Sequence, residues 1–307
     1  MKNILAYYYK VHPKEISYIN NQYSFTYEGN NYVLLVFNRP LSDANSLYKL
    51  NLEMIRRNIL VHKIIVNSEN NILTSINNIP YILLEININP NVKITLSDIC
   101  SINNNSINIE CDKQIARYDW SNLWETKNDY FEMQINEIGK KYPSLCNYAN
   151  YYIGLAENAI VYVKNAINID DKAYLCISHK RIRNNSTLFS LYNPMDLIYD
   201  FRVRDASEYI KNAFFNNENA LYLVREFFNN NYITYKEALL FYGRLLYPSY
   251  FFDLQDDIVN NNLDEKLIEK VAEKSNEYEI FLRDTYLYIS SLYNTYVPAV
   301  DWLIKRS

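Results

Sequence analysis

The stretch "CISHKRIRNNSTLFSLYNPMDLIYDFRVRDASEYI", from Cys176 to Ile210, decides how the chain is organised. It begins at the end of an apolar run, AYLCIS, whose length and composition are typical of a buried strand. A polar loop that contains His179 follows directly, and from Asp205 onward apolar residues recur at helical spacing. The stretch therefore predicts a strand, a loop and the start of a helix.

The chain before this stretch has the pattern of a small α+β lobe. Residues 15–37 alternate and are rich in Tyr, Ile and Val, with "EGNN" at the centre, which predicts a β-hairpin. After Pro40, Ser42 is expected to cap a helix that ends at Arg56 and Arg57. Two further strands are expected, at VHKIIV and at YILLEININ. This lobe is predicted to cover residues 1–90.

The remainder, residues 91–307, is predicted to be a larger and mainly helical lobe. Residues 91–113 are polar and rich in Asn, which indicates an irregular connection or a pair of short strands. Beyond Trp120 the apolar residues follow a 3.6-residue period. Helices are expected from 120 to about 138, over 149–166, 207–215, 219–228 and 234–246, and in one long segment over 264–292.

Composition limits the class of protein. The 307 residues are 49% hydrophobic, which is ample for a globular core, and the net charge of −4 provides no basic field for nucleic acid or an anionic membrane. No apolar run is long enough to span a bilayer, and the first residues lack the pattern of a signal peptide. The four cysteines are far apart, without a CxxC motif. These features predict a cytoplasmic protein in a reducing compartment.

The order of these elements resembles the protein-kinase-like fold of aminoglycoside and choline phosphotransferases. Within that superfamily the chain is most similar to the spore-coat kinase-like proteins of the CotS and YutH type. The likeness lies in the His179 loop and in two phrases, "RVRDASEYIK" from Arg202 to Lys211 and "RLLYPSYFFDL" from Arg244 to Leu254. The resemblance implies a two-lobed fold, with a catalytic loop near residues 176–205.

The resemblance also implies where the catalytic groups should stand. The family's chemistry needs an Asp two residues after the loop His, an Asn five residues further on, and a second metal-binding Asp on the next strand. These positions hold Arg181, Ser186 and, counting back from Asp205 by the spacing that the resemblance implies, Asn193. A neutral amide is a poor substitute for a carboxylate on Mg²⁺. Catalysis by the usual residues is therefore not expected.

The small lobe lacks its part of the phosphotransfer machinery too. Gly29 is the only glycine before Gly139, whereas a phosphate-binding loop needs glycines for close backbone approach. The strand YVLLVF has no Lys to hold the phosphates, so Glu53 on the following helix has no such partner. We therefore predict a kinase-fold pseudoenzyme with a structural or binding role, without a metal site and without ATP or Mg²⁺ as cofactor.

Two alternatives use other residues of the loop. Asp196 or Asp200 could serve as base or metal ligand in an active, atypical small-molecule phosphotransferase that uses ATP and Mg²⁺. Arg181 and Arg183 could instead hold an anionic ligand, although a short basic run is more often a solvated loop. His179 is expected to be mainly architectural. The resemblance implies other proteins as partners, among them spore coat components, and a role in sporulation or coat assembly.

Overall fold

The computed structural model describes residues 1–19, 21–86 and 91–305. The chain divides into two compact units. Unit 1 consists of Met1–Arg117 and Leu175–Asp200, and unit 2 consists of Tyr118–Tyr174 and the chain from Phe201 onward. The predicted lobe boundary at residue 90 lies outside the described residues, and unit 1 continues beyond it. Most of the predicted catalytic loop therefore belongs to the same compact unit as the small sheet.

Unit 1 is built on an antiparallel sheet with the strand order β1-β2-β3-β6-β4, in which β5 also pairs with β6. The hairpin predicted at "EGNN" is present, and its two turn residues, Glu28 and Gly29, both have positive φ, at 48° and 83°. Two such residues form the turn that matches the twist of paired strands. The strand bounds are β1 (Ser17–Ile19), β2 (Gln22–Tyr27), β3 (Asn30–Val36), β4 (Lys63–Ile65), β5 (Thr74–Ile76) and β6 (Ile79–Ile86).

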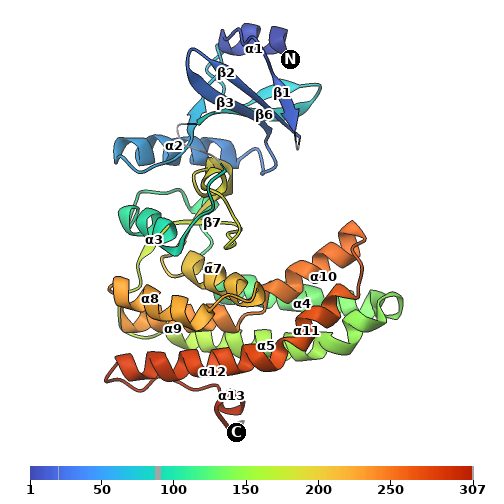
Figure 1. Ribbon diagram of the computed structural model, residues 1–307, viewed down its shortest axis with the longest axis vertical. Coiled ribbons are helices and arrows are strands. Elements are labelled where there is room, and N and C mark those ends of the chain that lie inside the picture. The colour runs from blue at the N-terminus through green and yellow to red at the C-terminus, as the bar shows by residue number, and fades with distance from the viewer. Residues whose placement is uncertain (20, 87–90, 306–307) are drawn as a thin grey trace. The chain divides into compact units, whose positions relative to one another are not determined.

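Helices cover both faces of this sheet (Figure 1). On one face Leu34 and Leu83 stand opposite each other and pack with Leu5, Phe25 and Val11, which brings in helix α1 (Lys2–Tyr9), a helix that was not predicted. The other face meets α2 (Asp43–Arg56), the predicted helix, which buries Leu47, Leu50 and Met54 at the expected spacing. Ser42 occupies the N-cap position, but its side chain makes no capping hydrogen bond.

The expectation of an irregular connection over residues 91–113 is wrong in its central part. Residues Leu96–Asn105 form α3, and a capping box begins it: the Thr95 hydroxyl accepts from the Asp98 amide while the Asp98 carboxylate accepts from the Thr95 amide. The Asn-rich composition of this segment led to the prediction of a loop, although the capping-box residues Thr95 and Asp98 indicate the start of a helix. Unit 1 is completed by the pair β7 (Leu175–His179) and β8 (Leu197–Phe201), the short helix α6 (Leu188–Leu191), and the 3₁₀ turns η1 (Lys113–Ile115) and η3 (Pro194–Asp196).

Unit 2 is helical. The predicted helices correspond to α4 (Trp120–Ile138), α5 (Pro143–Ile167), α7 (Arg204–Phe215), α8 (Ala220–Asn230) and α9 (Tyr235–Leu246). The predicted long helix over 264–292 is instead two helices, α11 (Leu267–Glu273) and α12 (Ser275–Leu292). The turn η2 (Gly139–Lys141) and the helices α10 (Ser249–Asn261) and α13 (Asp301–Lys305) were not predicted.

A glycine allows two helices of unit 2, α5 and α9, to pack closely. Helix α5 packs against α4 and α9. A Cβ atom at Gly243 on α9 would lie 2.5 Å from the Cγ2 atom of Val163 on α5. Only glycine allows these two helices to approach so closely.

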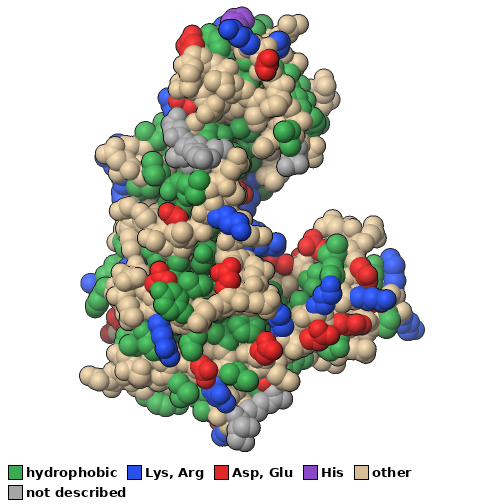
Figure 2. Space-filling model, viewed as in Figure 1, with side chains coloured by type: hydrophobic (Ala, Val, Ile, Leu, Met, Phe, Trp, Pro, Cys, Tyr) green, Lys and Arg blue, Asp and Glu red, His purple; other side chains and the backbone are tan. Residues whose placement is uncertain are grey.

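The structure confirms the predicted fold class, α+β with a small sheet-containing N-terminal part and a larger helical part. Within the described residues, none of the helices has the length and apolar character needed to cross a membrane. On the face shown in Figure 2, acidic and basic side chains are intermingled, and neither sign forms a continuous field.

Candidate functional site

His179 ends strand β7 and is almost completely buried, with 1% of its surface exposed. Its Nε2 atom lies 2.7 Å from the backbone oxygen of Leu191 at the end of α6. Because a carbonyl oxygen can only accept, Nε2 carries the proton and donates it. The ring thus joins the start of the loop to its middle, which is the architectural role expected for this residue.

The next part of the loop turns tightly on itself. Arg181 and Arg183 are both exposed. Ser186 closes the turn, because its hydroxyl accepts from the Arg183 amide at 3.1 Å and its own amide donates to the Arg183 carbonyl at 2.9 Å. Ser186 stands where the family would place an Asn that binds magnesium, and its hydroxyl here holds the loop. The structure does not test whether Arg181 and Arg183 bind an anion.

Asn193 and Asp196 bind each other. The Asn193 side-chain oxygen accepts from the Met195 amide, which caps η3, and its Nδ2 donates to the Asp196 carboxylate at 2.9 Å. The amide of Lys180 donates to the Asp196 backbone carbonyl at 2.8 Å. The Asn193 side chain is therefore fully engaged in shaping the turn that leads into β8.

Asn193 does not lie on the strand after the loop. That strand is β8, and the acidic residue on it is Asp200, which is completely buried. Strand β8 pairs with β7, the strand that ends at His179. The structure therefore places Asp200, rather than Asn193, on the element where the resemblance implies the second metal-binding Asp. Only Arg202 and Val203 separate β8 from α7. The count back from Asp205, near the start of α7, therefore ran past the whole of β8 and reached Asn193.

Arg39 is the main component of this region that the sequence did not predict. It follows β3, and its buried guanidinium donates from Nε to Asp43 at 2.9 Å and from Nη1 to the carbonyls of Met195 at 3.2 Å and Leu197 at 2.7 Å. Its Nη2 atom is buried without a hydrogen-bond partner among the described residues. Arg39 thus fastens the start of α2 to the entry of β8.

Burial dominates the electrostatics around Arg39. Burial lowers the pKa of Arg39, although the hydrogen bond to Asp43 opposes the shift. Burial also lowers the pKa of Lys180, and the positive charge of Arg39 adds to the effect. The pKa of Asp196 is raised by burial against the influence of His179 and of the Asn193 hydrogen bond. Each group is shifted towards its neutral form, which disfavours a site of high charge.

The Glu53 side chain forms ion pairs with neighbouring residues at the end of α2. Its carboxylate accepts from Arg56 at 2.7 Å and from Arg57 at 2.6 Å. These hydrogen bonds lower the pKa of Glu53 to about 2. In an active kinase of this layout the corresponding carboxylate would pair with the phosphate-binding lysine. Here that lysine is absent from β3. Glu53 instead pairs with Arg56, the last residue of α2, and with Arg57, its C-cap residue.

These residues fit Mg·ATP poorly. The strand that should carry a phosphate-binding lysine has none, and the loop position that should orient the acceptor hydroxyl carries a cation. Throughout the described ranges, no three His, Cys, Asp or Glu side chains gather closely enough to hold a metal ion. At this loop position the chain carries Arg181 in place of the carboxylate that would accept the proton of a hydroxyl nucleophile.

Comparison with known proteins identifies the relatives of the chain. The family described as "Spore coat putative kinase YutH" matches residues 2–285. The endospore coat-associated protein YutH of Bacillus subtilis strain 168 is 27% identical in an alignment 212 residues long, which covers 61% of this chain. The match covers 62% of the length of that relative.

Solved structures agree with the predicted fold. An aminoglycoside phosphotransferase from Alicyclobacillus acidocaldarius superposes with a TM-score of 0.63, covering 95% of this chain and 96% of its own, at 10% identity. The AMP-bound spectinomycin phosphotransferase APH(9)-Ia superposes with a TM-score of 0.58, covering 89% and 93%, at 13% identity. Likeness at this level of identity establishes the fold alone, which is the protein-kinase-like fold predicted from the sequence.

Proposed function

Because the chain belongs to the YutH family of spore coat kinase-like proteins, we propose that it is a catalytically inactive kinase-fold protein that associates with the endospore coat. It acts by binding other coat proteins and transfers no phosphate. Its relative in Bacillus subtilis is named an endospore coat-associated protein, which supports the same location for this chain.

The position of Arg181 carries the proposal that the chain is inactive. A phosphotransferase of this fold orients the acceptor hydroxyl with a carboxylate at this place. An exposed arginine cannot accept the proton of that hydroxyl, because its guanidinium stays protonated at any physiological pH. The absence of a lysine from β3 supports the same conclusion, since it leaves the phosphates of a nucleotide without their usual clamp, and Glu53 pairs with Arg56 and Arg57 instead of with such a lysine.

Thermal unfolding in the presence of Mg·ATP tests the proposal. A site with a Kd of about 50 µM would stabilise the fold by about 2.7 kcal/mol at about 5 mM ligand. We expect no shift of the unfolding midpoint beyond that produced by MgCl₂ alone, and no transfer of ³²P from ATP to protein, aminoglycoside or choline acceptors. An active aminoglycoside phosphotransferase serves as the positive control. A clear shift together with transfer would refute the proposal.

Asp200 favours a second candidate function, an atypical small-molecule phosphotransferase that uses ATP and Mg²⁺. It lies on β8, in the element where the resemblance implies a metal-binding Asp. Should Mg·ATP stabilise the chain, Asp200→Asn distinguishes the two functions. Loss of the shift in this variant, with a normal midpoint in the absence of ligand, would support the enzyme. The corresponding Asp196→Asn variant tests the other carboxylate in the same way.

A further inference from the structure

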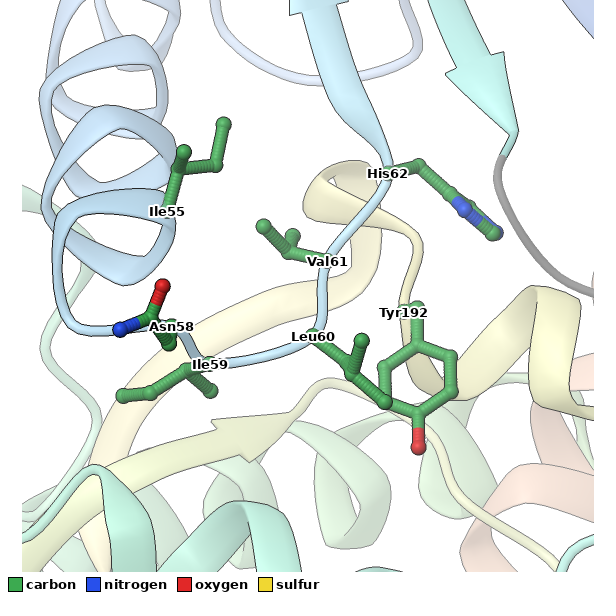
Figure 3. A pocket seen from close by; sticks show the side chains of 7 residues that line it. All are labelled: Ile55, Asn58, Ile59, Leu60, Val61, His62 and Tyr192. Atoms are coloured by element: carbon green, nitrogen blue, oxygen red, sulfur yellow. The ribbon is translucent and has the colours of Figure 1, made fainter. Parts of the chain in front are cut away.

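The pocket drawn in Figure 3 offers no charge to a ligand. It has a volume of about 270 Å³ and is lined by Ile55, by residues 58–62 and by Tyr192. In Figure 3 Leu60 lies beside the Tyr192 ring, and His62 is directed away from it. Burial also lowers the pKa of His62 to about 4, so this histidine carries no charge at neutral pH. A group of charged side chains lies elsewhere in unit 1, at the beginning of β8.

Three basic residues from distant parts of the chain contact the same segment, residues 195–199 of η3 and β8. The side chain of Arg39 donates from Nη1 to the first and third backbone carbonyls of this segment, at 3.2 and 2.7 Å. The amide of Lys180 donates to the second carbonyl and the amide of Arg117 to the fifth, both at 2.8 Å. All of these residues belong to unit 1. The fold therefore gathers three basic residues at the place where β8 begins.

The three side chains are close enough to influence one another. Burial is the main cause that lowers the pKa of Arg39 and of Lys180, and the positive charge of Arg117 adds to both shifts. The acids with the largest influence on the same two groups are Asp43 and Asp196. Asp43 accepts from Arg39 at 2.9 Å, whereas Asp196 is bound by a side-chain amide. Three cations thus share two carboxylates, and the cluster has an excess of one positive charge.

Two further acids lie near this cluster but influence it less. Asp112, which precedes η1, is paired with Lys49 at 3.5 Å. Asp200 follows the contacted segment on β8 and is completely buried. Neither acts on the buried bases as strongly as the two acids above do. The local field at the beginning of β8 is therefore positive.

Both arginines of the cluster have donors that the described residues do not satisfy. The Nη2 atom of Arg39 is buried and has no hydrogen-bond partner there. Arg117 is half-buried, donates from Nη1 to two carbonyls of the preceding turn, and forms no ion pair with a described residue. Leaving a buried charged donor without an acceptor is costly. These donors therefore favour a ligand that brings negative charge and several acceptor oxygens.

We propose that this cluster binds one phosphate group between Arg39, Arg117 and Lys180. The two guanidinium groups donate charge-assisted hydrogen bonds to the phosphate oxygens, and the charge of Lys180 adds to the attraction. A phosphate is preferred to a carboxylate because it supplies three acceptor oxygens and about two negative charges to three cations. The bound group removes the repulsion among the bases and so stabilises unit 1. The proposal does not rest on the proposed function, because it holds whether or not the chain transfers phosphate.

Inorganic phosphate tests the site on the full chain. Its Kd is measured by isothermal titration calorimetry without Mg²⁺, and the unfolding midpoint is compared in sodium phosphate and in sodium chloride of equal ionic strength. We expect saturable binding of one phosphate per chain and a midpoint that rises with phosphate beyond its value in chloride. Absence of saturable binding would overturn the proposal, as would a rise that chloride reproduces.

Variants of two neighbouring bases show whether the phosphate binds at this site. Arg117→Gln removes a charged donor and should raise the Kd for phosphate at least about tenfold. Lys113→Gln is the matched control, because it removes an exposed positive charge from η1, the turn that precedes Arg117, and should leave the Kd unchanged. Equal Kd values in the two variants would contradict the proposal. Arg39→Met should also weaken binding at least about tenfold, and hydrogen exchange without phosphate shows that this variant is folded.

Three phosphate compounds distinguish the source of the group. Inorganic phosphate, phosphoserine and ADP are compared in the parent chain and in Arg117→Gln. The compound that binds most tightly, and loses affinity in the variant, identifies the source as free phosphate, a phosphorylated protein or a nucleotide. Tight binding of ADP would support the site but contradict the expected absence of nucleotide binding, so this proposal and the proposed function fail separately. Affinities that are unchanged in the variant for all three compounds would refute the site.

Discussion

Each unit buries a cluster of charged side chains, and the two clusters differ in how fully they are paired. In unit 2 the Glu208 carboxylate accepts from Lys211 at 3.2 Å, Arg244 at 2.6 Å and Ser249 at 2.9 Å. Lys211 also donates to the Tyr247 carbonyl and to Ser249. Arg244 lies over the rings of two tryptophans, Trp120 and Trp124. In unit 1, by contrast, Arg39 donates to one carboxylate and two carbonyls, and its Nη2 atom has no hydrogen-bond partner among the described residues.

The difference indicates what each cluster does. Burial alone would raise the pKa of Glu208, but the charges of Lys211 and Arg244 lower it, so this acid stays ionised in the fold. A fully satisfied network of this kind fixes the packing of the helices that carry it. The Arg39 cluster lies beside the loop where a phosphotransferase would keep its reactive charges. The Arg39 cluster therefore holds two segments of unit 1 together with one of its buried donors unsatisfied.

Removing the Glu208 charge should have the largest effect on stability. In Glu208→Gln, the buried Lys211 and Arg244 lose the carboxylate that pairs with both of them, and breaking a buried pair in this way costs about 3–5 kcal/mol. Trp120 and Trp124 touch Arg244, so tryptophan fluorescence during urea unfolding reports on this unit. A loss below about 1 kcal/mol would show that solvent reaches the cluster.

Glu53→Gln is the matched control, because Glu53 also binds two cations. Arg56 is 72% exposed and Arg57 is 33% exposed, whereas the side chains of Lys211 and Arg244 are 2% and 6% exposed. Exposed pairs contribute little to stability, because water screens them, so Glu53→Gln should cost much less than Glu208→Gln. Equal losses in the two variants would mean that burial does not distinguish the clusters.

A buried histidine in unit 1 should make that unit sensitive to acid. His62 donates from Nε2 to the Phe189 carbonyl at 3.1 Å, and burial lowers its pKa to about 4. Because the unfolded chain binds the proton first, near its ordinary pKa of about 6.5, stability should fall as the pH drops from about 6.5 to about 4, by about 3 kcal/mol in total. Amide hydrogen exchange over residues 1–117 measures this loss within unit 1.

Two histidine variants separate this effect from the titration of carboxylates. His62→Gln removes the titrating group, so unit 1 should lose less stability between these two pH values than the parent chain does. His12→Gln removes an exposed histidine and should lose as much as the parent. An unchanged pH dependence in His62→Gln would assign the acid sensitivity to other groups.

The sequence was sufficient for elements whose signals are local. The hairpin at Glu28 and Gly29 and the helix α2 follow from turn residues and periodicity. Helix α3 was missed because its asparagines suggested a loop, although Thr95 and Asp98 have the spacing of a capping box. Helix α10 was not predicted, and Pro248, which lies shortly after the end of α9, is its N-cap residue. Here a single residue is compatible with both the end and the beginning of a helix.

Less of the candidate site could be predicted from the sequence, because its contacts join distant parts of the chain. The position of His179 at the end of a strand could be predicted from the apolar run before it. Arg39 could not, because its carbonyl partners Met195 and Leu197 lie more than 150 residues away in sequence. The assignment of Asn193 depended on spacing alone, and the short connection after β8 shifted it away from the strand that carries Asp200.

Replacing Arg39 should have a smaller effect than replacing Glu208. Arg39→Met leaves Asp43 buried without its partner, which is destabilising, but it also removes a buried nitrogen that has no hydrogen bond. These contributions oppose each other, and we expect a net loss of about 2 kcal/mol in the stability of unit 1. Hydrogen exchange over residues 1–117 again provides the measurement.

The double variant Arg39→Met with Asp43→Asn completes the test of the Arg39 cluster. Removing both charges should restore all but about 1 kcal/mol of the parent's stability, because neither charge is then left buried alone. The corresponding double variant in unit 2, Glu208→Gln with Lys211→Met, still leaves Arg244 buried and unpaired and should recover less. If both double variants regained the same amount of stability, the unpaired nitrogen of Arg39 would have no energetic consequence. The two clusters would then differ only in the number of their charges.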